Sequence, residues 1–330
     1  MSLTLAPAPV LANILDAVGH TPLLRLRLGA VPAGVELWGK CEWFNPGGSV
    51  KDRTALSIVT EGERSGALRP GRTIIDSSSG NTAVGLALVG RAKGHPVELV
   101  MPESVGEERQ RLCRAYGAKI VFTDALSGSD GAIVKVREKV AAVPALYFYA
   151  DQYRNPANPL AHYRTTGPEI WEQTGGLVTH FVAGLGTSGT VVGTSRYLRE
   201  RNPRVRVVAA EPDHGLHGLE GLKHMASAMV PDIYEPRAHD DKISVVTEDA
   251  YAVCAQVLRE DGLLVGHSAG AALWAAREVA RTLRSGVVVV LLPDGGERYL
   301  GADKPRGPGG CGAPPSSKSE RGIHSRASER

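Results

Sequence analysis

Lys51 stands where its amino group could act in covalent or proton-transfer chemistry. It belongs to the segment Asn45–Arg53, NPGGSVKDR, in which Ser49 and Asp52 fit the S-x-x-D pattern that begins a helix. We therefore expect Lys51 in the first helical turn, where the helix dipole and burial would lower the pKa of its amine. A lowered pKa is typical of a nucleophilic or Schiff-base lysine. Taken alone, the motif fits a solvated surface lysine better.

Two further loops carry groups that could bind anions. The loop 76–82, DSSSGNT, follows a predicted strand and precedes an apolar helix, and the loop 184–190, GLGTSGT, stands in the same relation to its neighbours. Free backbone N–H groups at a helix N-terminus bind anions, and glycines let a phosphate approach the backbone closely. Taken alone, the loop 76–82 fits an ordinary capped turn better.

The glycines of the loop 184–190 also match the G-x-G-x-x-G fingerprint of dinucleotide-binding proteins. Glu211 lies about twenty residues further on, as a ribose-binding acid would. A nicotinamide enzyme, however, gives no role to Lys51 or to the loop 78–82. One phosphate loop, one loop suited to a carboxylate and one activated lysine, all at strand ends, together indicate pyridoxal phosphate holding an amino acid.

The elements that must position these loops alternate between strands and helices. We predict strands at 35–44, 73–75, 96–101, 119–122, 146–149, 179–184, 205–210 and 286–292, and helices at 49–66, 81–93, 106–116, 130–143, 160–174, 188–201, 248–261 and 268–282. Several strands are continuous runs of Val, Ile and Leu, which is typical of parallel sheets covered on both faces. The chain is therefore predicted to be an α/β protein, with 212–243 as an irregular functional loop.

The composition agrees with an ordinary globular protein. The 330 residues suggest about two domains, and 42% are apolar while 22% are charged. No apolar run reaches membrane-spanning length, and the start of the chain does not match a secretory signal. The net charge of +3 equals that of the last thirty residues, which hold six Lys/Arg and three Asp/Glu. A nucleic-acid-binding surface is therefore not expected.

Cysteine and histidine placement gives no sign of a metal site. The cysteines are scattered and form no C-x-x-C, which favours a reducing cytoplasm; they are Cys41, Cys113, Cys254 and Cys311. The histidines of the irregular region lack an acidic ligand pattern, so we expect polar loop residues; they are His214, His217 and His224.

At the level of whole motifs the chain resembles the fold-type II pyridoxal-phosphate enzymes, and most closely the cysteine synthases. The resemblance spans about residues 20–300 and rests on eight ordered motifs: GHTPL at 19–23, NPGGSVKDR at 45–53, SSGNT at 78–82, Gln152 with NPAN at 155–158, TTGPE at 165–169, GLGTSGT at 184–190, GHSAGA at 266–271, and PD at 293–294 with ERYL at 297–300.

The resemblance implies a fold like that of the tryptophan synthase β subunit, with two doubly wound parallel-sheet domains and the cofactor between them. Residues 44–152 would form a small mobile domain. Residues 1–43 and 153–302 would form a large cofactor-binding domain. The segment 303–330, rich in Gly, Pro, Ser and Arg, is expected to be a disordered basic tail.

The resemblance also assigns roles. Lys51 would carry pyridoxal 5'-phosphate covalently, Asn81 would hydrogen-bond the ring hydroxyl oxygen, and Ser268 would face the pyridine nitrogen. The phosphate would be held by Gly186, Thr187, Ser188, Gly189 and Thr190. The substrate carboxylate would be bound by Ser78, Ser79, Thr82 and Gln152.

These roles imply β-replacement on an O-activated L-serine by a sulfur nucleophile, giving L-cysteine. A neutral hydroxyl at Ser268 does not hold a proton on the ring nitrogen, which favours β-elimination over transamination. Lys51 would take the α-proton. The alternatives are cystathionine β-synthase or a serine dehydratase of the same fold, an NAD-dependent dehydrogenase, and a sulfur-responsive binding module. Intact Lys51, Ser79, Asn81 and Ser268 argue against the last.

Lys223 bears on the choice of substrate. Lys223 and His224 are basic where the resembling stretch of sulfide-using cysteine synthases is uncharged, whereas B-type and O-phosphoserine-using enzymes are basic there. We expect Lys223 to favour an anionic partner, either O-phosphoserine or a thiosulfate-like or thiocarboxylate donor. The alternative is a solvated lysine paired with Glu220 at i, i+3. The resemblance further implies a cytoplasmic homodimer, with a sulfur-carrier protein as one candidate donor.

Overall fold

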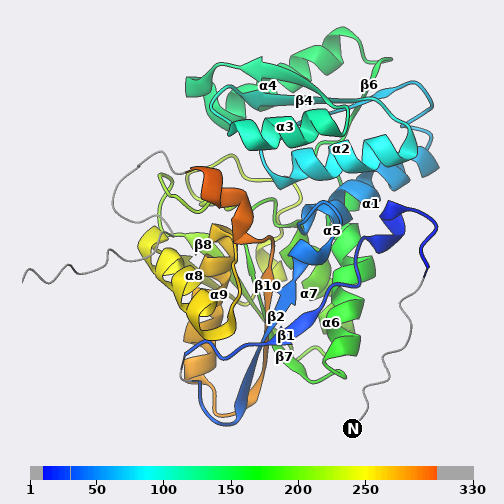
Figure 1. The fold of residues 1–330 in the computed structure, drawn as a ribbon. Coiled ribbons are helices and arrows are strands. Elements are labelled where there is room, and N and C mark those ends of the chain that lie inside the picture. Colours follow the sequence, from blue (N-terminus) through cyan, green and yellow to red (C-terminus); the bar gives the residue numbers. More distant parts are fainter. Residues whose placement is uncertain (1–9, 30, 303–330) are drawn as a thin grey trace, which may run out of the picture.

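The computed structural model describes residues 10–29 and 31–302, and the expected tail 303–330 with Cys311 lies outside them. Two separate α/β sheets divide the described chain (Figure 1). The larger has the order β1-β2-β10-β7-β8-β9, with only β1 antiparallel to its neighbour. Its strands are β1 (Leu23–Arg25), β2 (Val35–Cys41), β7 (Val178–Gly184), β8 (Arg206–Pro212), β9 (Asp241–Val245) and β10 (Gly286–Leu292).

The smaller sheet has the order β5-β4-β3-β6 and is parallel throughout. Its strands all fall within residues 44–152; they are β3 (Thr73–Ser77), β4 (Val97–Pro102), β5 (Lys119–Thr123) and β6 (Tyr147–Tyr149). In Figure 1 this sheet, with α2, α3 and α4, stands above the larger one.

Helices cover both faces of each sheet. They are α1 (Lys51–Arg64), α2 (Asn81–Lys93), α3 (Glu107–Ala115), α4 (Gly128–Ala142), α5 (Ala157–Ala161), α6 (Gly167–Gln173), α7 (Gly189–Arg201), α8 (Thr247–Asp261) and α9 (His267–Thr282). Alternate residues of β10 enter different cores: Val288 and Val290 pack with α8 and α9, and Val289 with α6 and α7. The uninterrupted GVVVVLL run therefore follows from burial on two sides, and the doubly wound α/β architecture is confirmed.

Four details of the predicted elements are wrong. The strand predicted to reach residue 44 ends at Cys41, because Glu42–Phe44 forms a 3-10 turn. The helix predicted at 160–174 is interrupted by a π-helical turn, His162–Thr166. The edge strand β1 was not predicted. The edge strand β9 lies where the irregular loop was expected to continue to 243.

A buried network of four charged side chains joins the large sheet to α1 and α6. Arg53 donates from Nε to Glu42 (2.7 Å) and from NH1 to Glu169 (2.6 Å). Lys40 donates to Glu169 Oε2 (2.7 Å) and to the Thr21 carbonyl (2.7 Å). Two cations face two carboxylates, so the network is neutral as a whole. It fixes α1 at its first turns, directly after Lys51.

Candidate active site

A cavity of about 260 Å³ lies between the two sheets. Residues at or near the carboxyl ends of β3, β4, β7 and β10 line it, together with the loops that follow. The carboxyl ends of parallel strands are where open α/β sheets bind ligands. The three loops singled out in the sequence all meet here, since the cavity wall includes Lys51, 77–82 and 186–188.

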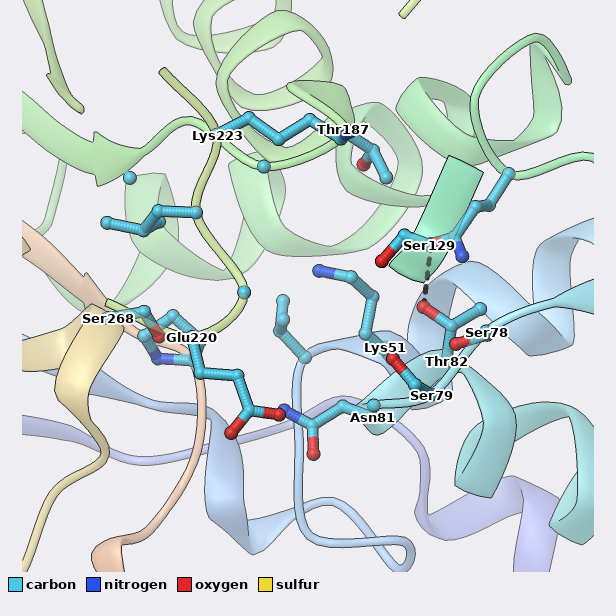
Figure 2. Close-up of a pocket in the computed structure, with 18 of the residues that line it drawn as sticks. Lys51, Ser78, Ser79, Asn81, Thr82, Ser129, Thr187, Glu220, Lys223 and Ser268 are labelled. Carbon is cyan, nitrogen blue, oxygen red and sulfur yellow. Dashed lines mark hydrogen bonds between the residues drawn. The ribbon is translucent and has the colours of Figure 1, made fainter. Parts of the chain in front are cut away.

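Lys51 is the first residue of α1, and its amino group points into the centre of the cavity (Figure 2). Burial lowers the pKa of Lys51, and the charges of Asp294 and Glu42 oppose this only in part. The direction is the expected one. The largest cause is desolvation by burial, not the helix dipole. A neutral amine in this place can act as a nucleophile or as a base.

The predicted capping interaction between Ser49 and Asp52 does not form. The residue before α1 is Val50, and Ser49 Oγ accepts a hydrogen bond from the Lys51 N–H (3.2 Å). The Asp52 carboxylate instead accepts from the Gly47 N–H (2.5 Å). Burial raises the pKa of Asp52 to about 7, although the Gly47 N–H and the Arg298 charge oppose it. The pattern therefore located the helix start but not its contacts.

The loop before α2 brings together the residues assigned to the substrate carboxylate. Thr82 Oγ1 donates to Gln152 Oε1 (2.7 Å), the contact dashed in Figure 2. Ser78 Oγ accepts from the Ala83 N–H (3.1 Å), so its own proton is free to point toward the cavity. Ser79 lines the same wall. Hydroxyls and an amide at a helix N-terminus form a suitable site for a carboxylate.

Asn81, the first residue of α2, is held from two sides. Its Nδ2 donates to Asp294 Oδ2 (2.7 Å), and its Oδ1 accepts from Arg298 NH1 (3.0 Å). Tyr299 also donates to Asp294 Oδ2 (2.6 Å). The sequence motifs PD and ERYL contained these three partners, but nothing in their spacing indicated a contact with Asn81.

The loop before α7 has the shape of an anion-binding nest. Ser188 adopts a left-handed conformation, with φ of 70°, immediately before the helix begins at Gly189. Successive N–H groups around such a residue converge on one point, and the helix N-terminus adds its positive end. The cavity wall includes Gly186, Thr187, Ser188 and Thr190.

Two residues that the sequence argument missed hold this loop in place. Asn158 donates from Nδ2 to Thr187 Oγ1 (3.0 Å) and to the Gln152 carbonyl (2.8 Å). His162, in the π-helical turn, faces Thr190 Oγ1 (3.3 Å). Burial lowers the pKa of His162 well below its usual value, so the ring is neutral. Asn158 appeared only within the motif NPAN, and His162 carried no signal; π-helical turns are, however, often found at functional sites.

Ser268 lies in the first turn of α9, on the opposite side of Lys51 from Ser78 in Figure 2. Its side chain is buried against the cavity. The preceding His267 ring packs between Tyr251 and Tyr299, with ring centroids 4.4 and 4.7 Å away. These contacts fix the start of α9 and leave a neutral hydroxyl as the polar group that Ser268 offers to the cavity.

Lys223 does not pair with Glu220, so that alternative is wrong. Glu220 instead pairs with Arg109 of α3, which also lies over the Tyr299 ring. The Lys223 amine lies 5.0 Å from the centroid of the Tyr153 ring. Burial lowers the pKa of Lys223, with Asp130 opposing. Within the described residues no carboxylate lies within ion-pair distance of Lys223, and its side chain lines the cavity.

Glu211 is not available to a ribose. It is buried and accepts from Lys242 Nζ (2.7 Å) and from the Met225 N–H (3.2 Å). The glycine loop thus lacks the acid that a dinucleotide site needs.

Of the three loop histidines, His217 and His224 make local contacts with Leu219 and Ser227.

The groups around the cavity fit pyridoxal phosphate. A weakly basic amine faces an anion nest, and a neutral hydroxyl and an asparagine amide complete the wall. Beside them lies a second, carboxylate-sized group of hydroxyls.

No helix in the part of the chain that the structure describes is long and apolar enough to cross a membrane.

Comparisons with known proteins agree. A family model described as "Pyridoxal-phosphate dependent enzyme" matches residues 14–294. The chain is 50% identical over 295 residues to the cysteine synthase of Aquifex aeolicus, covering 87% of this chain and 90% of that one. It is 37% identical to cysteine synthase B of Escherichia coli, covering 88% and 95%. The crystal structure of O-acetyl serine sulfhydrylase isoform 3 from Entamoeba histolytica superposes with a TM-score of 0.86 at 36% identity, covering 91% and 93%.

Proposed function

Because this chain belongs to the family of pyridoxal-phosphate-dependent enzymes, we propose that it is a cysteine synthase. It replaces the activated hydroxyl of an O-activated L-serine by a sulfur nucleophile and releases L-cysteine. The observation that carries this function is the Lys51 amine, which faces the anion nest before α7 and the hydroxyl loop before α2 in one cavity.

Lys51 and Ser268 divide the chemistry of the reaction. Bound pyridoxal phosphate supplies the electron withdrawal that makes the substrate α-proton acidic. Lys51 Nζ takes that proton, because burial lowers the pKa of its amine and so favours the neutral form that accepts a proton. Ser268 would offer a hydroxyl to the ring nitrogen, where a carboxylate would hold a proton, and would so favour loss of the β-substituent. We assign the phosphate to residues 186–190.

The substrate is oriented through its carboxylate by Ser78, Ser79, Thr82 and Gln152. The Thr82–Gln152 hydrogen bond joins α2 to the segment that follows β6. A carboxylate bound to this pair places the α-carbon within the same cavity as Lys51. We further propose that residues 44–152 close over the bound substrate as a small domain.

The direct test is a purified enzyme given O-acetylserine and sulfide. We expect a yellow protein that forms L-cysteine, because the covalently bound cofactor absorbs visible light. Formation of cystathionine from serine and homocysteine at a higher rate would favour the alternative that the enzyme is a cystathionine β-synthase. A colourless protein that binds a nicotinamide dinucleotide tightly would overturn the proposal.

We also propose that Lys223 selects an anionic partner. A phosphate leaving group or a thiosulfate-like donor brings negative charge into the cavity that Lys223 lines, and no carboxylate among the described residues pairs with its amine. A charge-assisted hydrogen bond contributes about 1.5–3 kcal/mol, so its loss should cost about ten- to hundredfold. The Lys223→Ala variant is therefore expected to lose that factor in kcat/KM with O-phosphoserine or thiosulfate, and much less with O-acetylserine and sulfide.

The matched control is Lys135→Ala, which removes a half-exposed lysine on α4 that pairs with Glu138. It should change no substrate preference. If Lys223→Ala lowers kcat/KM equally for every pair of substrates, Lys223 is structural and the proposed selectivity is wrong.

We further propose a cytoplasmic homodimer that can receive sulfur from a carrier protein as well as from a small donor. The burial of Cys41 and Cys113 as free thiols supports a reducing compartment. Light scattering of the purified protein would test the dimer, and a monomer at micromolar concentration would contradict it.

A further inference from the structure

The Asn81 amide can be oriented in only one way. Its Nδ2 faces the Asp294 carboxylate, which accepts hydrogen bonds, and its Oδ1 faces the Arg298 guanidinium, which donates them. A flipped amide would set oxygen against carboxylate and N–H against guanidinium. The amide group carries two N–H bonds, and only one is used by Asp294. The other N–H is not used by Asp294, and Asn81 lines the cavity.

Asp294 is itself fixed in several ways. It is fully buried and accepts from Tyr299 (2.6 Å) as well as from Asn81. Its backbone carbonyl accepts from the Gly266 N–H (3.2 Å), and it forms an isolated β-bridge with Ser49. A Cβ on Gly266 would overlap Asp294 Oδ1. The carboxylate therefore lies where the loop before Lys51 meets the start of α9.

Arg298 is held on the other side of the amide. Its NH1 donates to Asn81 Oδ1 (3.0 Å), and its NH2 donates to the Gly47 carbonyl. Arg298 thus joins Asn81 to the loop that leads into α1. Asn81 belongs to the smaller sheet's domain, whereas Asp294 and Arg298 follow β10 of the larger sheet. The amide is oriented across the boundary between the two.

We propose that Asp294 and Arg298 are positioning residues that fix the Asn81 amide with an N–H toward the cavity. A bound molecule must then place a hydrogen-bond acceptor opposite Asn81. This inference deepens the proposed function and rests on it, since the acceptor is then the hydroxyl oxygen on the ring of pyridoxal phosphate. Neither residue touches the reacting atoms. They act by excluding the flipped amide, which would present a carbonyl to that oxygen and repel it.

The test uses Asp294→Asn, in which the Oδ2 that accepts from Asn81 and Tyr299 can be exchanged for an N–H in a side chain of the same shape. An amide can face either end of Asn81, so the flipped form becomes accessible. We expect the holoenzyme to lose cofactor on dialysis at least about tenfold faster, the factor for a hydrogen bond to a charged acceptor. The pH at which the visible absorption band of the bound cofactor changes should also move.

A double-mutant cycle separates positioning from general damage. If Asp294 acts through Asn81, then Asp294→Asn should have no further effect on cofactor loss or on the pH titration once Asn81 is Ala. Equal losses in the two backgrounds would overturn the inference. Arg298→Met is the second variant, and it should repeat the same pattern from the other side of the amide even if Asp294→Asn fails to fold.

Failure of the proposed function looks different. A wild-type protein without bound pyridoxal phosphate would remove the function itself. A yellow wild-type enzyme whose cofactor retention and absorption are unchanged in both variants would remove only the positioning role.

Discussion

The Lys51→Ala enzyme should fold, bind pyridoxal phosphate without a covalent bond, and form almost no cysteine. Lys51 is the amine that points into the centre of the cavity, and burial lowers its pKa so that it can both attack the cofactor and accept a proton. Loss of a general base alone lowers rates by about 10²–10⁴-fold. The measurement is kcat with O-acetylserine and sulfide, beside the visible spectrum before and after gel filtration.

Lys51→Arg is the informative companion. It keeps a positive charge at the start of α1 but provides a group that stays protonated and forms no covalent bond with the cofactor. Both variants should therefore lose the visible band on gel filtration. If Lys51→Ala kept a tenth of the wild-type rate, another residue would have to supply the base, and the assignment of Lys51 would be wrong.

The Glu169→Gln enzyme should be destabilised by about 3–5 kcal/mol, because it leaves two buried cations facing one carboxylate. Glu169 accepts from Arg53 NH1 (2.6 Å) and from Lys40 Nζ (2.7 Å), and its side chain is only 13% exposed. Urea unfolding at pH 7 measures the loss. The control is Glu107→Gln, which removes an exposed partner of Arg111 and should change stability by less than about 1 kcal/mol.

The difference in unfolding free energy between the wild-type and Glu169→Gln enzymes should depend on pH. Burial would raise the pKa of Glu169, but the hydrogen bonds and charges of Arg53 and Lys40 hold it at about 2. The native state therefore binds fewer protons than the unfolded chain, whose Glu titrates near 4.3. The stabilisation is full above that value and is lost as the pH falls toward 2. The difference in unfolding free energy between wild type and Glu169→Gln should shrink over that interval; a constant difference would contradict the assignment.

Much of the fold could be predicted because the sheets are buried on both faces. The apolar run GVVVVLL at β10 and the apolar helix α2 are readily predicted as buried elements in a protein of this composition. The edge strands were missed for two different reasons. β1 is only three residues long, Leu23–Arg25, whereas β9 is largely exposed and polar at Asp241, Lys242 and Ser244. The π-helical turn His162–Thr166 has no local pattern in the sequence.

The site divides along the same line. The loops at 45–53, 76–82 and 184–190 were found from chemistry because phosphate and carboxylate sites use backbone N–H groups at helix starts. The roles of Asn81 and Ser268 came only through resemblance. Other residues act through contacts with residues distant in the chain, and such contacts produce no recognisable spacing in the sequence. They are Asp294, Arg298, Asn158 and His162.

The close packing of the loop before α7 and of the first turns of α7 also limits how this chain can change over generations. A Cβ at Gly186 would overlap the Gly221 carbonyl, one at Gly189 the Asn158 side chain, and one at Gly193 the Pro159 carbonyl. Two of these neighbours are backbone, which no compensating side-chain substitution can remove. Neutral drift therefore has almost no single-step path through these glycines, and sequence divergence among functional descendants must accumulate elsewhere.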